Sequence, residues 1–494
     1  MPANLWNQML PSRREVLRRV GAGMGLLGLA SVWPSSSALP NALAGNPSRS
    51  DLVSNPLTPK PPHFAPRAKR VIHLLMNGGV SHVDTFDYKP DLSKYAGQRP
   101  KEVDLQTQRK TTTIFPSPFK FRRHGQSGGW VSELFPHVAK CIDDICVIHS
   151  MHTDIPEHAA ALSMLNVGAN ELNRPSLGSW LVYGLGTENQ NLPGFVVLCH
   201  KGAPRPFAPS WSSAFLPGGC SGTFVDTRDH DPDKCIAHLS NPWLTHGQQH
   251  RQLTFLNRLN RLQLSNLERE AALEARIRSF ELAFRMQLEA PEAFDIHREN
   301  QSTLDLYGIG PEPTFSKVGG RPFGGFAEGC LLARRLSERG VRMVQLAFAP
   351  DIAWDDHADI MAHRAKAREC DQAIAALLTD LKNRGLLDET LVVWAGEFGR
   401  TPTFDPTGKK PGRDHNHYGY TVWLAGGGLR GGMRYGATDI FGMRAVEKPV
   451  HVHDLHATIL HVMGIDHEQL TFRYSGRDFR LTDVEGMVVH DILR

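Results

Sequence analysis

Short apolar segments alternate with longer amphipathic segments along most of the chain, and this alternation constrains the fold more than any other feature. The apolar segments are 69–76, 145–148, 342–348 and 390–395, and the amphipathic ones lie around 131–141, 326–339 and 362–384. Gly385 supplies the stop of the last helix. Buried strands that alternate with helices predict an α/β fold, with a mainly parallel sheet covered by helices on both faces.

Two further segments complete the predicted topology. Leucines recur at near-helical spacing between about 250 and 290, which predicts one or two helices inserted into the sheet topology. We expect this insertion to cover the sheet, and a partner-binding helix is the alternative. Residues 420–425 predict a strand, and the glycines of 426–432 predict a turn. They do not match a phosphate-binding loop, because neither a helix pattern nor a Lys-Ser/Thr pair follows them.

The N-terminal 44 residues are typical of a twin-arginine export signal. Arg13-Arg14 precede an apolar run from Val20 to Trp33, and Ala42-Leu43-Ala44 follows as a small-residue cleavage site. An uncleaved anchor or an amphipathic helix is the alternative. We predict a signal peptide over 1–44, a flexible tether over 45–67 and a single domain over 68–494. The export machinery is then a partner, and the mature protein is periplasmic or secreted.

The charge and the cysteines exclude several classes of partner and site. Residues 1–44 contain four Arg and one Glu, so their removal lowers the formal net charge from +4 to +1. This balance predicts no nucleic-acid surface. No apolar stretch after the signal approaches the length of about 20 residues that a transmembrane helix needs. The seven cysteines form no Cys-x-x-Cys pair, so a zinc knuckle is not indicated.

Polar side chains follow the predicted strands, at the edge where α/β sheets bind ligands. Ser81 and Asp84 follow the first strand, where a capped turn is the alternative. His158 follows the second strand and opens a predicted helix over 159–166. Asp355 and His357 follow the strand 342–348, and their mixture of carboxylate and imidazole suits zinc, manganese or calcium. A solvated surface loop is the alternative there.

Two more segments reach the same edge. Glu397 and Arg400 follow the strand 390–395, where the arginine can hold a phosphate or sulfate, or pair with the glutamate. His415 lies in a polar loop before the next strand. The histidines 451, 453, 456 and 461 surround a predicted helix that starts near Asp454, and here we favour helix capping and packed side chains over a site.

Four motifs stand out together along the chain. They are Gly78-Gly79-Val80-Ser81-His82-Val83-Asp84-Thr85-Phe86-Asp87, Arg174-Pro175-Ser176-Leu177-Gly178-Ser179-Trp180, Gly396-Glu397-Phe398-Gly399-Arg400-Thr401-Pro402 and Gly412-Arg413-Asp414-His415. These motifs resemble those of a family of exported bacterial proteins, the domain of unknown function numbered fifteen hundred and one, which is placed with the sulfatases in the alkaline phosphatase superfamily. The resemblance covers the chain from about Val71 onward.

The resemblance implies an alkaline-phosphatase-like fold with a metal site at the strand ends, but the chain departs from the superfamily pattern. Asn77 stands where the first metal-binding Asp is expected, and Glu397-Phe398 stands where Asp-His is usual. No Cys-x-Pro-x-Arg or Ser-x-Pro-x-Arg motif is present, so a formylglycine nucleophile cannot form. Alignment backward from Gly168 places His158 at the nucleophile position.

We therefore expect a metal-dependent hydrolase of sulfate or phosphate esters that acts on an anionic substrate such as a sulfated glycan. The expected cation is zinc, calcium or manganese, with Asp355, His357 and His415 as ligands and Glu397 and Asp84 as further candidates. His158 is expected as nucleophile or general acid, with a metal ligand as its alternative role. Ser81 and Thr153 are the hydroxyl alternatives, and Arg400 is expected as the anion-binding residue. The alternative is a non-catalytic exported binding protein that keeps the fold.

Overall fold

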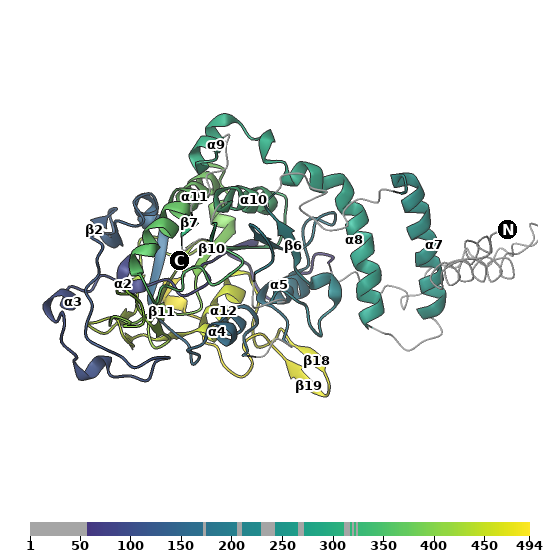
Figure 1. The fold of residues 1–494 in the computed structure, drawn as a ribbon. Helices are drawn as coiled ribbons and strands as arrows, with labels where there is room; N and C mark the ends of the chain where they lie inside the picture. The colour runs from purple at the N-terminus through teal and green to yellow at the C-terminus, as the bar shows by residue number, and fades with distance from the viewer. Residues whose placement is uncertain are drawn as a thin grey trace, which may run out of the picture. The chain divides into compact units, whose positions relative to one another are not determined.

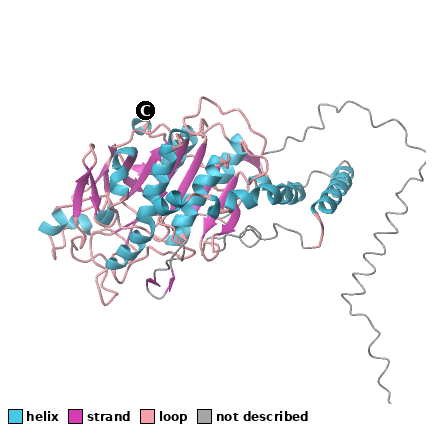
Figure 2. Ribbon diagram, turned by 90° about the horizontal axis from the view of Figure 1, so that it is seen from above, coloured by secondary structure: helices cyan, strands magenta, loops and turns pink. Residues whose placement is uncertain are grey.

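A nine-stranded sheet forms the centre of the described part of the chain. The structure, a computed structural model, describes residues 57–170, 174–204, 210–228, 243–264, 271–310, 317–318, 321–322 and 325–494. The strand order is β14-β4-β13-β10-β1-β9-β5-β6, and β17 pairs with β4. Figure 2 shows the strands as magenta arrows flanked by cyan helices. The strands are β1 (Arg70–Leu75), β4 (Ile145–His152), β5 (Phe195–Cys199), β6 (Thr223–Asp226), β9 (Met343–Ala347), β10 (Thr390–Ala395), β13 (Tyr420–Gly426), β14 (Arg434–Tyr435) and β17 (Val450–His451).

Helices cover both faces of this sheet. Successive side chains of β1 point to opposite faces and therefore lie in two different cores. Ile72 and Leu74 belong to one core, and Val71 and Leu75 belong to the other. The first core is closed by α10 (Phe326–Glu338) and α11 (His363–Asn383), and the second by α4 (His158–Val167), α5 (Leu177–Leu185) and α12 (Val452–Val462) (Figure 1). The predicted α/β fold with helices on both faces is confirmed.

The remaining elements lie in the connections. The short helices are α2 (His82–Thr85), α3 (Asp91–Lys94), α9 (Gln301–Tyr307), and the 3-10 turns η1 (Lys101–Val103), η2 (Val138–Asp144), η3 (Gly218–Cys220), η4 (Ile296–Arg298), η5 (Ile360–Ala362), η6 (Leu387–Glu389) and η7 (His490–Ile492). The two-stranded ribbons are β2 (Phe121–His124) with β3 (Gly129–Ser132), β7 (Lys317–Val318) with β8 (Arg321–Pro322), β11 (Gly399–Arg400) with β12 (His415–Asn416), β15 (Ala437–Thr438) with β16 (Ala445–Glu447), and β18 (Phe472–Tyr474) with β19 (Arg477–Phe479).

One central strand runs against the others. β1 pairs in parallel with β9 and β10, whereas β13 is antiparallel to both of its neighbours, β10 and β4. The chain reaches β13 from β10 without a crossover helix, because residues 396–419 form only the β11–β12 ribbon and loops. Because no helix carries the chain back to the opposite edge of the sheet, β13 begins at the edge where β10 ends and runs antiparallel to β10. The loops at this edge therefore come from β1, β4, β9 and β10 and from the start of β13.

The predicted helix over 131–141 is wrong. Residues 129–132 form β3, and only 138–144 form the turn η2. Pro136 lies in the middle of the predicted helix, where it lacks an N–H donor and clashes with the preceding turn. Gly129 and Trp130 instead pair with the strand β2.

Residues 57–67, which belong to the predicted tether, lie against the domain. The backbone N–H of Lys60 donates to the Leu185 carbonyl at 2.9 Å, and that of His63 donates to the Gly464 carbonyl at 2.9 Å. Leu57 is buried in the second core. Residues 1–56, which include the predicted export signal, lie outside the described residues.

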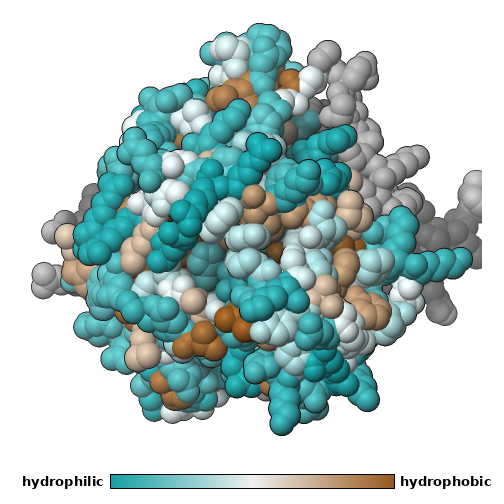
Figure 3. All heavy atoms as spheres, turned by 90° about the vertical axis from the view of Figure 1, so that its left-hand side faces the viewer, coloured by the Kyte–Doolittle hydropathy of each residue, from teal (hydrophilic) through white to brown (hydrophobic). Residues whose placement is uncertain are grey.

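The predicted helical insertion is present as α7 (His246–Leu264) and α8 (Ala271–Phe294). α8 packs against η3 and α10, and α7 contacts α8. None of the helices in the described ranges is both long enough and apolar enough to cross a bilayer. The face shown in Figure 3 is mostly hydrophilic, with apolar side chains in small separate groups.

Candidate functional site

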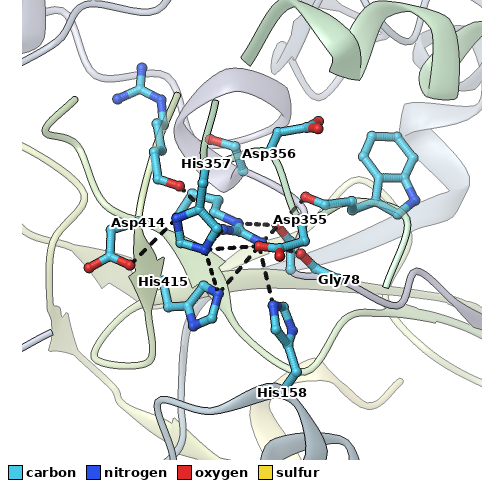
Figure 4. A network of polar contacts seen from close by, with 12 residues as sticks. Gly78, His158, Asp355, Asp356, His357, Asp414 and His415 are labelled. Carbon is cyan, nitrogen blue, oxygen red and sulfur yellow. Dashed lines mark hydrogen bonds and ion pairs between the residues drawn. The ribbon is translucent and has the colours of Figure 1, made fainter. Parts of the chain in front are cut away.

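One carboxylate oxygen lies at the centre of the site. Asp355 Oδ1 is 3.0 Å from His357 Nε2, 3.3 Å from His415 Nε2 and 3.3 Å from His158 Nε2. Arg400 Nη2 donates to the same oxygen at 2.7 Å. The dashed lines from the three imidazoles meet at this carboxylate in Figure 4. The structure thus brings together five of the eight residues that the sequence predicts for the site: His158, Asp355, His357, His415 and Arg400.

Glycines at the end of β1 let the Asp355 loop approach the sheet edge. Gly78 has φ of +115°, and a Cβ atom there would lie 2.5 Å from the Trp354 backbone nitrogen. Only glycine fits this combination of left-handed backbone and close contact. Asn77 fastens the same loop, because its Nδ2 donates to the carbonyls of Ala349 and Asp351. The asparagine that replaces the expected acid therefore ties the loop after β9 to β1.

Each of the three imidazoles is oriented by an acceptor on its other nitrogen. His158 Nδ1 donates to Glu397 Oε1 at 2.6 Å, and His357 Nδ1 donates to Asp405 Oδ2 at 2.7 Å. His415 Nδ1 donates to the Pro156 carbonyl at 2.8 Å. A neutral imidazole that donates from Nδ1 presents a lone pair at Nε2. This outer arrangement is the one by which proteins orient metal-binding histidines.

The electrostatics of the site favour a cation. Three imidazole lone pairs and a carboxylate oxygen face one another, which is repulsive unless positive charge lies between them. Four carboxylates surround the histidines, those of Asp355, Glu397, Asp405 and Asp414. Two of them contact a guanidinium group, Asp355 that of Arg400 and Asp405 that of Arg109. Neutral imidazoles then leave two negative charges, the charge that a divalent cation balances.

Burial and neighbouring groups shift the pKa values of three residues of the site. Burial opposes ionisation of Asp355, but the Arg400 guanidinium outweighs it and holds the pKa of Asp355 far below its ordinary value. Burial lowers the pKa of His415 to about 4, so this imidazole is neutral at physiological pH. Burial also disfavours the charged form of His158, but Asp355 and Glu397 outweigh it and raise the pKa of His158. The two carboxylates beside His158 therefore stabilise positive charge on its ring.

Two overlapping groups of residues meet the geometric requirement for a metal ion within the described ranges. One contains His158, Asp355 and His415, and the other contains His357, Asp414 and His415. Asp414 Oδ1 is buried, has no hydrogen-bond partner and lies 3.8 Å from His357 Nδ1. The two groups share His415, and His357 lies between their carboxylates, with Asp355 near its Nε2 atom and Asp414 near its Nδ1 atom.

Glu397 and Arg400 support this centre from behind. Both side chains are fully buried. Glu397 accepts the Gly78 N–H through both oxygens, at 2.9 and 3.1 Å, in addition to His158 Nδ1. Arg400 donates to the carbonyls of Gly78, Gly79 and Arg413 as well as to Asp355. Glu397 therefore contacts His158 on the side of the ring away from Asp355. The Arg400 guanidinium donates its hydrogen bonds to acceptors of the protein itself.

Asp84 and Ser81 form a separate buried cluster. Arg413 Nε donates to Asp84 Oδ2 at 2.6 Å, and Ser81 Oγ donates to the same oxygen at 2.5 Å. Burial opposes ionisation of Asp84, but the Arg413 guanidinium outweighs it and lowers the pKa of Asp84. Neither Asp84 nor Ser81 belongs to the two metal-ligand groups. Their contacts fasten the turn after β1 to the segment that carries His415.

Another buried cluster holds the loop that carries Asp355 and His357. Asp356 points away from the centre and accepts from His363 Nδ1 at 2.6 Å and from Lys366 Nζ at 2.5 Å. The Ser81 backbone N–H donates to His363 Nε2 at 3.1 Å. Asp355 and His357 thus face the centre of the site, whereas Asp356 between them faces α11.

Sequence reasoning missed the groups that orient the histidines. Asp405 and Arg109 stand in loops far from any predicted strand end, and the Pro156 carbonyl acts through the backbone. Asp414 and Asp356 are each adjacent in the sequence to a predicted ligand, and this adjacency is the one signal that could have identified them. The spacing of Asp405 and Arg109 carries no such signal.

Comparison with known proteins gives a family match and several remote structural similarities. No curated protein matches the chain. A solved sulfatase from Pseudoalteromonas sp. is 12% identical, with a TM-score of 0.33 over 81% of this chain and 69% of that one. A phosphonate monoester hydrolase from Silicibacter pomeroyi is 13% identical, with a TM-score of 0.29 over 67% and 68%. A lipoteichoic acid synthase from Listeria monocytogenes is 10% identical, with a TM-score of 0.30 over 86% and 78%.

The family model of proteins of unknown function DUF1501 matches residues 68–493, a range that contains all the residues of the site. The chain belongs to the DUF1501 family.

Proposed function

We propose that this chain is a metal-dependent hydrolase of sulfate or phosphate esters, and that Asp355 and the Nε2 atoms of His158, His357 and His415 hold its cation. The observation that carries this proposal is the convergence of three Nε2 atoms on one carboxylate oxygen while each Nδ1 atom donates elsewhere. Packing alone does not require three separate ring orientations to agree in this way.

The donor set favours zinc or manganese over calcium. Three imidazole nitrogens and a carboxylate suit zinc or manganese, whereas calcium takes six to eight oxygen ligands. When bound, such a cation would polarise the ester oxygen and make water nucleophilic near neutral pH.

The surrounding residues keep the ligands in place and leave the nucleophile to solvent. Arg400 holds the Asp355 carboxylate, and Glu397 fixes the ring of His158. Ser81 Oγ is buried against Asp84, and both nitrogens of His158 face carboxylates. We therefore expect a water molecule, rather than Ser81 or His158, to attack the ester.

The proposal extends to substrate and location. The resemblance of the sequence motifs to the sulfatases supports an anionic ester, with sulfated glycans as the first class to screen. The Arg13-Arg14 motif and the apolar run after it support export by the twin-arginine machinery to the periplasm or beyond. Residues 68–494 would then act as a single exported domain.

Metal analysis of the full-length protein tests the proposal. The wild type is expected to bind one zinc or manganese ion per chain, and the double variant Asp355→Ala/His357→Ala should weaken this affinity by roughly 100-fold or more, because it removes two direct ligands. His451→Ala is the matched control. His451 accepts the His453 N–H at Nδ1, so its proton lies on Nε2, which is therefore not available as a metal ligand.

Metal-loaded wild type should then hydrolyse members of a panel of aryl sulfates and phosphates. Folded wild-type protein that binds none of zinc, manganese and calcium would overturn the proposal and favour a binding protein that keeps the fold. Equal loss of metal in the His451 variant would show that the bound metal is not at Asp355.

A further inference from the structure

An anionic ester needs a cationic group to receive its negatively charged oxygens, and Arg400 does not supply it. The Arg400 side chain is fully buried, and its donors already serve Asp355 and the carbonyls of Gly78, Gly79 and Arg413. A substrate oxygen would have to displace contacts that hold the site together. Any protein donor that assists the proposed cation in binding the ester must therefore be another residue.

Arg109 has the geometry that Arg400 lacks. Its Nη1 donates to Asp405 Oδ2, the oxygen that also accepts from His357 Nδ1, and to Thr407 Oγ1 at 2.6 Å. Its side chain is 37% exposed. The Nε and Nη2 atoms donate no hydrogen bond to any other described residue, so they remain available to a ligand. One carboxylate and one imidazole ring separate this guanidinium from the Asp355 oxygen.

The loop that carries Arg109 is fastened to the site. The Arg109 backbone N–H donates to Asp414 Oδ2 at 2.8 Å. Tyr418 Oη donates to the Gln106 carbonyl at 2.9 Å, and Ile114 pairs with Thr403 in an isolated bridge. These contacts come before and after Arg109 in the sequence, so the arginine is positioned before any ligand arrives. A guanidinium held in advance loses little freedom when it binds an anion.

We infer that Arg109 binds the anionic group of the substrate through Nε and Nη2 while Nη1 stays on Asp405. This assignment rests on the proposed function and names the specificity residue of the same site. Two parallel N–H donors match two oxygens of a sulfate or phosphate group. The arginine would therefore select substrates that carry an anionic group at the distance from Asp355 that Asp405 and the ring of His357 set.

The test measures binding of inorganic phosphate and, separately, inorganic sulfate to full-length protein at saturating zinc, by calorimetry. Arg109→Ala is expected to weaken the binding of the preferred anion by roughly 10- to 100-fold, the effect of losing charged hydrogen bonds. Arg109→Lys should recover part of the affinity, since it keeps the charge but loses the pair of donors. Arg122→Ala, an exposed arginine on β2, is the matched control and should bind like the wild type.

The outcomes separate the two proposals. If the wild type binds zinc and the anion, and Arg109→Ala binds the anion equally at full zinc occupancy, the assignment of Arg109 is overturned while the metal site stands. If Arg109→Lys matches the alanine variant in a folded, zinc-loaded protein, positive charge at this position is not what binds the anion, and the assignment also fails. If the wild type binds no metal, the proposed hydrolase fails. Anion binding that Arg109→Ala abolishes would still support the arginine in that case.

Discussion

Two groups of histidines in this protein differ in which ring nitrogen is committed. In the site, His158, His357 and His415 donate from Nδ1 and direct Nε2 toward Asp355. On α12, His456 and His453 bond through Nε2 to the carbonyls of Leu165 and Gly168, at 2.8 and 2.9 Å. Those carbonyls belong to the C-terminal end of α4, where backbone acceptors lack helical partners. The number of histidines is thus a poor guide to function, and the committed nitrogen is a good one.

The same comparison explains why α12 is structural. His451 accepts the His453 N–H, and Asp454 accepts the His451 N–H, so the two residues form a capping box at the start of the helix. The prediction of capping and packed histidines in this segment is therefore confirmed, with Asp454 as the third residue of the helix rather than its cap. α12 in turn fixes the far end of α4, whose first residue is His158.

Replacing a site histidine should produce the largest difference between the two groups. His415→Ala is expected to weaken zinc affinity by roughly 100-fold or more, because a direct ligand is lost, with little change in the free energy of unfolding of metal-free protein. His456→Ala should do the reverse. Zinc titration and urea unfolding of both variants check this, and metal loss in both would abolish the distinction.

Removing the acceptor behind a site histidine should have the next largest effect. Glu397→Gln keeps the shape of the side chain but can present its amide N–H to His158, which disturbs the orientation of the ring. We expect zinc affinity to fall by roughly 10- to 100-fold, as for other outer partners of metal-binding histidines. A calorimetric titration measures this effect, and unchanged affinity would show that the ring of His158 needs no such acceptor.

The packed histidines should make the protein sensitive to acid. Burial lowers the pKa of His73 to about 4 and that of His456 to about 3. Both lie below the ordinary histidine value near 6.5, so the unfolded state binds more protons between these limits. The free energy of unfolding should therefore fall as the pH drops below about 6.5 and continue to fall toward pH 3. Urea unfolding of metal-free protein at several pH values checks the slope, and a flat profile would contradict it.

The variant with the smallest expected effect, His456→Leu, tests which histidine makes the free energy of unfolding depend on pH. His456→Leu removes the donor to the Leu165 carbonyl but also removes a buried Nδ1 atom that has no hydrogen-bond partner. The two changes offset in part, so we expect a loss of about 1 kcal/mol at pH 7.5. The variant should also show a shallower decline of stability toward pH 4 than the wild type. An unchanged slope would assign the acid sensitivity to other groups.

The sequence predicts the fold and the inner residues of the site because both depend on local signals. Apolar runs predict the strands β1, β9 and β10, and polar residues directly after strands are brought to one edge by the sheet itself. The reversed direction of β13 depends on a missing crossover helix, and the pairing of Asp405 with both His357 and Arg109 depends on loops that meet only in the folded chain. Glu397 and Asp84 have the right chemistry for ligands, but long-range contacts with Gly78 and Arg413 give them other partners.

The amide of Asn77 makes this position intolerant of an acid. Its Nδ2 donates to two carbonyl oxygens of the loop after β9, whereas a carboxylate at the same place would turn its own oxygens toward those carbonyls. An aspartate at position 77 would therefore require residues 349–351 to move together with the substitution, so two separate parts of the chain would have to change at once.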